Sequence, residues 1–205
     1  MPMSARMTCL RFAMFAVLAA GGTSARADPY RDGLAAWVKG DFVTAVRILT
    51  PLADNGDPAA QTVLGGAYVD GWGVEKDCAK GLELLSKAAQ AGARHAEYLM
   101  GRLSATGTCV TKSDEDALFH YKSAAAKHDP DAEFEIGNFY MTGRGAPLDL
   151  IEAHRWLTLC VRDGKDLPSY SRKHVDTAQH ILDQLDTFLN KADITRANAL
   201  ADATK

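Results

Sequence analysis

Small and apolar residues recur every 36 positions along most of this chain. Repetition at a fixed period of this length is the sequence signature of a solenoid built from repeated small units. The period divides residues 58–165 into three units without any gap: 58–93, 94–129 and 130–165. Two sets of glycines mark the register most clearly: Gly65, Gly101 and Gly137, and then Gly71, Gly107 and Gly143.

Each unit carries the pattern of two helices joined by a turn. In the first copy, apolar residues return at helical spacing over 59–69 and again over 78–92, and the stretch 70–77 between them is rich in glycine. One such pair cannot bury its apolar face alone, whereas stacked pairs can. Alternating β-branched runs, which would indicate strands, are missing. We therefore predict an all-α solenoid of stacked antiparallel helix pairs.

The glycines at 65, 101 and 137 fall in the middle of predicted helices. Glycine at such a position costs about 1 kcal/mol relative to alanine. Because the cost recurs at one register position, we expect a second helix to approach closely there.

The segments before and after the repeats are predicted to be capping units that close the ends of the solenoid. Residues 28–57 hold one more helix pair with a shorter turn, in which Asp41 is an expected N-cap and Pro51 must be tolerated inside a helix. Residues 166–205 hold two amphipathic helices, over 171–190 and 192–203, that lack the repeat pattern. Terminal units of solenoids commonly diverge in this way.

Residues 1–27 have the pattern of a secretory signal peptide. Basic residues precede the uncharged apolar run 12–22, and Ala25-Arg26-Ala27 is a small-x-small cleavage site. We predict cleavage after Ala27 and a periplasmic or secreted product that is not inserted in a membrane. The alternative is a retained N-terminal anchor.

Loss of this segment changes the charge of the chain. Three arginines leave with it, and the remaining 20 basic and 26 acidic residues give a net charge of −6. An acidic protein is poorly suited to binding nucleic acid or an anionic membrane surface. The remaining residues suffice for one domain, which we expect to be a monomer.

The chain lacks the usual catalytic and metal-binding motifs. None of its six histidines lies four residues from another, and Gly-x-Ser-x-Gly does not occur. Ser-x-x-Lys is absent after residue 27. We therefore expect no catalytic residue, cofactor or metal site, although distant units can assemble a site that no local motif reveals.

A partner is expected on the concave side of the stack, which first helices line. On the face opposite the core, Tyr98 and Phe134 lie 36 residues apart and are predicted to be neighbours, with Arg102 and Asn138 beside them. His95 and Asp131 belong to the same face. Aromatic residues flanked by arginine are typical of binding hot spots. Alternatively, these aromatics partly cover neighbouring units.

Trp72 lies in the glycine-rich turn of the first copy. It is a further candidate for partner contact, and packing within the turn is the alternative.

Residues 58–93 match a known repeat pattern at twelve positions: Ala60, Leu64, Gly65, Tyr68, Gly71, Gly73, Val74, Asp77, Leu85, Ala88, Ala89 and Gly92. Residues 94–129 depart from the pattern, with Ser104 for tyrosine, Cys109 for the second turn glycine and His128 for the last glycine. On these residues, the repeats resemble the Sel1-like family, which is related to the tetratricopeptide repeat.

The resemblance implies an adaptor or scaffold. Exported members include regulators of sensor kinases, virulence factors that contact host proteins, and cysteine-rich proteins that bind or slowly cleave β-lactams. We therefore expect an exported module that binds a protein or peptide partner. The alternative is a protein that binds or hydrolyses cell-wall material or β-lactams.

Three cysteines remain after residue 27. Cys78 begins a second helix and Cys109 lies in the turn of the next unit, so both lie at the same end of the stack in adjacent units. We predict that they form a disulfide in an oxidising compartment, with two free thiols as the alternative. Cys160 occupies an alanine position of the repeat and is expected to be a small buried residue, with a reactive or intermolecular thiol as the alternative.

Overall fold

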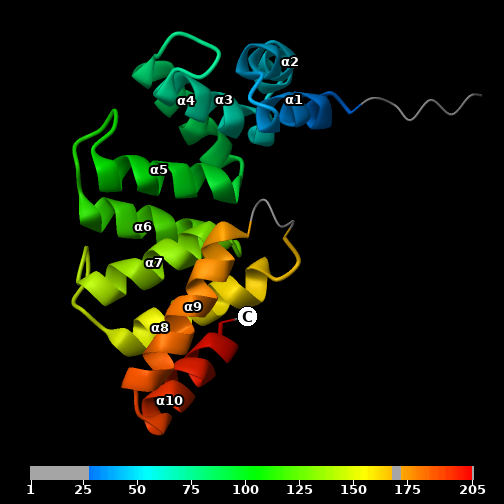
Figure 1. Ribbon diagram of the computed structural model, residues 1–205. Coiled ribbons are helices and arrows are strands. Elements are labelled where there is room, and N and C mark those ends of the chain that lie inside the picture. Colours follow the sequence, from blue (N-terminus) through cyan, green and yellow to red (C-terminus); the bar gives the residue numbers. More distant parts are fainter. Residues whose placement is uncertain (1–27, 168–171, 205) are drawn as a thin grey trace, which may run out of the picture.

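The computed structural model describes residues 28–167 and 172–204 (Figure 1). The predicted signal peptide, residues 1–27, therefore lies outside the described residues. The described ranges form ten helices: α1 (Pro29–Val38), α2 (Phe42–Asp54), α3 (Pro58–Asp70), α4 (Cys78–Gln90), α5 (Arg94–Thr106), α6 (Asp114–Ala125), α7 (Pro130–Thr142), α8 (Leu150–Gly164), α9 (Lys173–Phe188) and α10 (Lys191–Asp202).

The helices are stacked as antiparallel pairs, as predicted (Figure 1). In four successive units, α1, α3, α5 and α7 are the first helices, and α2, α4, α6 and α8 are their partners. Each second helix also packs on the first helix of the next unit. The predicted all-α solenoid is confirmed. Within the described ranges, no helix combines the length and the apolar character needed to cross a membrane.

Local sequence sets where the helices begin and end. Carboxylates accept hydrogen bonds from the first turn of most helices; Asp57, for example, accepts from the Ala60 N–H at 2.8 Å. The first helices of the three 36-residue units end at Gly71, Gly107 and Gly143, whose φ angles of 79°, 75° and 68° favour glycine. Pro51 is accommodated inside α2.

The mid-helix glycines are the points of closest approach within each pair. A Cβ atom on Gly65 would lie 2.7 Å from the Leu85 side chain and 3.1 Å from the Gly81 carbonyl oxygen. In the next unit, a Cβ on Gly101 would lie 2.6 Å from Tyr121. The predicted close approach of a second helix is therefore present.

Two adjacent glycines of α3 offer a direct test of this contact. Gly65→Ala is expected to destabilise the protein by about 1–2 kcal/mol, because overpacking outweighs the gain in helix propensity. Gly66 has no heavy atom closer to its Cβ position than Leu99 Cδ1 at 3.8 Å. Gly66→Ala is therefore expected to raise stability by about 0.5–1 kcal/mol. Urea denaturation measures both, and destabilisation of equal size in both variants would contradict the close-approach explanation.

A second set of glycines lies where the turn of one unit contacts the preceding unit. Gly73, at φ 72°, lies against the start of α2, where a Cβ would be 2.5 Å from the Phe42 carbonyl group. In the next unit, the corresponding residue is Cys109, a non-glycine residue at φ 65°. Cys109 forms the predicted disulfide with Cys78 at the start of α4, and their Cα atoms are 5.4 Å apart. A covalent link thus replaces a backbone contact between the units.

Replacing the bridge is expected to be costly. The double variant Cys78→Ser/Cys109→Ser should lose about 3–4 kcal/mol of stability, because the bridge closes a loop with a separation of 31 residues. Cys78→Ser/Cys109→Gly should lose about 1 kcal/mol less, because glycine adopts positive φ freely. Guanidinium denaturation of both variants without reductant measures the difference in unfolding free energy. Equal losses would show that positive φ at residue 109 costs no stability in a non-glycine residue.

The C-terminal helices close the stack. Helix α9 lies across α7 and α8, and α10 packs on α8 (Figure 1). Val175 of α9 fills the space beside Gly164, which is the last residue of α8 and has no positive φ. Gly164 therefore does not end the helix as the turn glycines do, but makes room for α9. Cys160 is fully buried, as predicted, and burial raises the pKa of its thiol.

Candidate partner-binding groove

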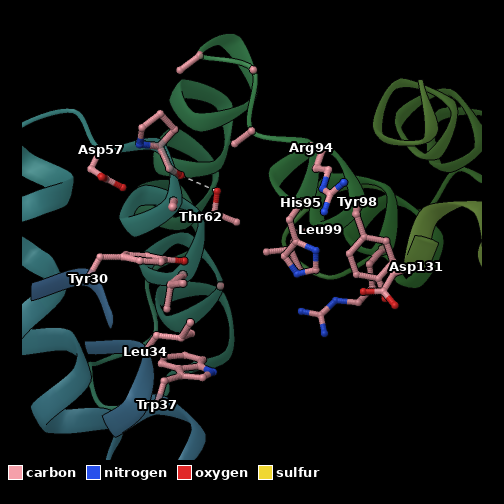
Figure 2. Close-up of a pocket in the computed structure, with 18 of the residues that line it drawn as sticks. Tyr30, Leu34, Trp37, Asp57, Thr62, Arg94, His95, Tyr98, Leu99 and Asp131 are labelled. Atoms are coloured by element: carbon pink, nitrogen blue, oxygen red, sulfur yellow. Dashed lines mark hydrogen bonds between the residues drawn. The ribbon is translucent and has the colours of Figure 1, made fainter. Parts of the chain in front are cut away.

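A groove of about 870 Å³ runs along the first-helix face of the first three units (Figure 2). One wall comes from α1 and the opposite wall from α5, and α3 forms the floor between them. The floor is low because α3 presents small residues there, namely Ala59, Thr62 and Gly66. The Thr62 hydroxyl donates to the Pro58 carbonyl at 2.7 Å within the same helix, so it is already satisfied.

Aromatic and apolar side chains face one another across this floor. Tyr30, Leu34 and Trp37 project from α1, and Tyr98 and Leu99 project from α5 (Figure 2). Burial raises the pKa of the Tyr98 hydroxyl, which therefore remains a neutral donor. A site with apolar walls and a few polar groups is the usual arrangement of a ligand-binding or peptide-binding surface.

Charged groups at the edge of the groove are held in place by partners. Arg102 forms an ion pair with Asp70 of α3 at 3.3 Å. The His95 ring stacks on Tyr98 with centroids 5.1 Å apart. Asp131 accepts a hydrogen bond from His174 Nδ1 at 2.8 Å, and the resulting ion pair raises the pKa of His174. The polar rim is therefore organised by contacts within the chain.

Trp72 belongs to an aromatic cluster at one end of the groove. Its ring lies 5.5 Å from Trp37 and 5.4 Å from Phe42, centroid to centroid. The residue nevertheless remains 43% exposed and lines the groove. Trp72 therefore packs against the aromatic cluster and also presents an exposed surface to the groove.

Tyr98 and Phe134 were predicted to lie side by side on the open face, but only Tyr98 lines the groove. Phe134 is 8% exposed and stacks face to face on His174 of α9, with centroids 4.6 Å apart. The expectation that Phe134 is available to a partner is therefore wrong, because α9 covers the first-helix face of the fourth unit. Asn138, one turn further along α7, does not line the groove. His95, Tyr98, Arg102, Asp131 and Trp72 do line it.

Sequence reasoning missed the wall formed by α1. Gly33 approaches Leu49 as Gly65 approaches Leu85, so these two glycines are equivalent although they are 32 rather than 36 residues apart. That register places Tyr30 at the position of Tyr98. Because the turn of the first unit is shorter, the 36-residue period does not align Tyr30 with Tyr98.

A second polar cluster, whose residues do not line the groove, lies where α7 meets the end of α8. Glu133 is 1% exposed, and His128 Nδ1 lies 2.6 Å from Asp163 Oδ2. Burial raises the pKa of Glu133 to about 9, and the neighbouring Asp163 contributes to the shift. Hydrogen bonds from Arg162 and His128 lower the pKa of Asp163 in spite of its burial. Asp163 is thus the ionised member of the pair and Glu133 the protonated one.

Stability should therefore fall with rising pH. Unfolding lowers the Glu133 pKa from about 9 to its ordinary value of 4.5, so the unfolded chain releases a proton that the folded chain keeps. Between pH 5 and pH 8, this group alone should remove about 1 kcal/mol of stability per pH unit. Glu133→Gln should abolish that slope, whereas Glu75→Gln, at an exposed position of a turn, should preserve it. Urea midpoints across this range measure the slopes. An unchanged slope in Glu133→Gln would show that the pH dependence of stability does not come from Glu133.

Helix pairs that stack through small residues, with first helices lining a groove, define the class of TPR-like helical-repeat proteins. The Sel1 repeat family model matches residues 58–92, 94–129 and 130–159. The chain therefore carries three Sel1 repeats and belongs to the Sel1-repeat proteins, as the resemblance of its sequence implied. This fold is typical of protein–protein interaction modules that are generally not enzymes.

Known proteins show the same repeat and the same fold. An uncharacterized protein of Neisseria meningitidis serogroup B is 29% identical over 104 residues, which are 51% of this chain and 21% of that protein. The chain thus spans about a fifth of the length of that curated relative. The crystal structure of a Sel1 repeat protein from Oxalobacter formigenes matches with a TM-score of 0.65 at 25% identity, covering 85% of this chain and 69% of that chain.

A second solved structure is a protective antigen present in uropathogenic Escherichia coli strains, which displays an SLR fold. It matches with a TM-score of 0.62 at 20% identity and covers 84% of this chain and 36% of that chain. At this identity, the likeness concerns the fold alone.

Proposed function

We propose that this protein is an exported interaction module that holds a peptide segment of a partner protein in the groove between α1, α3 and α5. The observation that carries the proposal is the groove itself, with aromatic side chains in its walls and fixed charges at its rim. Its width is set by the stacked helices, so little reorganisation accompanies binding.

The composition of the groove supports a peptide as the occupant. Tyr30, Trp37, Trp72 and Tyr98 offer large apolar surfaces that lose little side-chain entropy on binding. Arg102 and Asp70 provide both signs of charge near the same wall. A segment with apolar side chains and a polar backbone fits such a surface better than a uniformly charged ligand does.

Two observations support export. Residues 1–27 carry the signal-peptide pattern, and the described chain contains a disulfide between Cys78 and Cys109. Disulfides persist in oxidising compartments outside the cytoplasm. We therefore place the protein in the periplasm or outside the cell, where it acts as a monomer.

A peptide library displayed on phage provides ligands for a direct test. Peptides selected on the purified protein should bind Tyr98→Ala and Arg102→Ala at least tenfold more weakly in calorimetric titrations, because each variant removes a groove contact. Phe119→Ala is the matched control, since Phe119 is a 67% exposed aromatic residue on the second helix α6. It should bind the peptides as the unaltered protein does.

Circular dichroism and thermal melting first establish that all three variants are folded. Equal affinity for Tyr98→Ala and the unaltered protein would place the binding surface elsewhere. Weakening by Phe119→Ala alone would assign it to the second-helix face.

A further inference from the structure

Three side chains that could bind a metal ion meet at the junction between the third and fourth units. His128 lies in the turn before α7, Glu133 in the first turns of α7, and Asp163 near the end of α8. One nitrogen or oxygen atom from each residue lies within 4.8 Å of the corresponding atoms of the other two. The His128 side chain is 55% exposed, so solvent reaches the cluster from that side.

The cluster contains a carboxylate oxygen that the protein leaves without a partner. Glu133 Oε2 is buried and accepts no hydrogen bond. The corresponding residue of the second unit is Gln61, which is also buried but donates to the Ala53 carbonyl at 3.1 Å. At the same position of the third unit, Glu97 Oε2 lies 2.9 Å from His120 Nδ1. Glu133 differs from both residues because its Oε2 has no such partner and requires a cation or a proton.

The backbone at His128 is a second irregularity in the same place. His128 has φ 57°, whereas Gly56 and Gly92 occupy the corresponding positions at φ 86° and 91°. A side chain at positive φ is unfavourable, and such residues cluster at functional sites. Here the left-handed residue carries an imidazole directed at Asp163, with Nδ1 at 2.6 Å from Oδ2.

We propose that His128, Glu133 and Asp163 bind a divalent transition-metal ion of the zinc type. A dication would take the place of the Glu133 proton, bind the orphan oxygen and pair with the charge of Asp163. One imidazole nitrogen with two carboxylate oxygens is a donor set suited to Zn²⁺, whereas Ca²⁺ and Mg²⁺ prefer oxygen ligands throughout. Three protein ligands leave a fourth position for water.

The ligands are held by the surrounding structure to different degrees. Asp163 Oδ1 accepts from Arg162 Nε at 2.9 Å, and Arg162 also donates to carbonyl groups at the end of α10. Glu133 is buried in the core, whereas the imidazole of His128 is half exposed and is held by its contact with Asp163. The site would therefore link α7, α8 and the turn before α7, away from the groove.

A neighbouring cluster of His95, Asp129 and Asp131 has the same types of side chain. Its carboxylates already have other partners, because Asp129 caps α7 and Asp131 binds His174. We therefore assign the ion to the Glu133 cluster and use His95 as the control.

Calorimetric titration of the chelator-treated protein with ZnCl₂ at pH 7 tests the proposal. We expect one Zn²⁺ per chain, a rise in melting temperature with Zn²⁺, and no comparable effect of MgCl₂ or CaCl₂. Glu133→Gln should weaken Zn²⁺ binding at least tenfold and still fold, because the second unit already uses glutamine at this position. His95→Ala should leave the affinity unchanged.

His128→Gly separates loss of a ligand from loss of structure. Glycine restores the residue used at this position in the other units, so the metal-free variant should melt at or above the temperature of the unaltered protein while its Zn²⁺ affinity falls at least tenfold. Equal Zn²⁺ affinity in Glu133→Gln and the unaltered protein would overturn the proposal, as would loss of binding only in His95→Ala. Absence of Zn²⁺ binding at millimolar concentration would show that the cluster holds only a proton. None of these outcomes bears on the peptide-binding groove.

Discussion

The stack depends on one close contact, which each unit makes between its own two helices. A glycine in the first helix allows a large side chain of the second to rest on the helix backbone, as Leu85 does on Gly65 and Tyr121 on Gly101. This contact brings the two helices close enough for their small residues to interlock. Each pair then packs against its neighbours through successive helices, and repetition of the pair produces the solenoid.

The end of the stack decides how much of the first-helix face is open. Helix α9 is not part of a repeat, and its residues Val175, Ala178, Leu182 and Leu185 pack over the first-helix face of the fourth unit. The concave surface is therefore open along α1, α3 and α5 and closed at α7. For this reason, the equivalent aromatic residues of α5 and α7 differ in exposure. Tyr98 borders the groove, whereas Phe134 is buried beneath the cap.

Two non-glycine residues at positive φ mark places where the third unit departs from its neighbours. Cys109 replaces a glycine that elsewhere lies against the preceding unit, and it forms a covalent bond across that contact. His128 replaces the glycine that follows a second helix, and it lies beside Asp163 and the buried Glu133. Cys109 links its unit covalently to the preceding one, and His128 lies 2.6 Å from Asp163 of the following unit. Both residues therefore connect the third unit to a neighbour.

The amino-acid sequence alone predicts the repeat, the helix pairs, the close approach at the mid-helix glycines and the Cys78–Cys109 bridge. These features follow from a 36-residue period whose residues act mainly on their own unit or on the next one. The packing of the folded chain was needed to show that α9 buries Phe134, that Tyr30 and Trp37 complete the groove, and that Glu133 meets Asp163 and His128. Those contacts join segments without a common register, and a periodic pattern carries no information about them because it describes only neighbours that repeat.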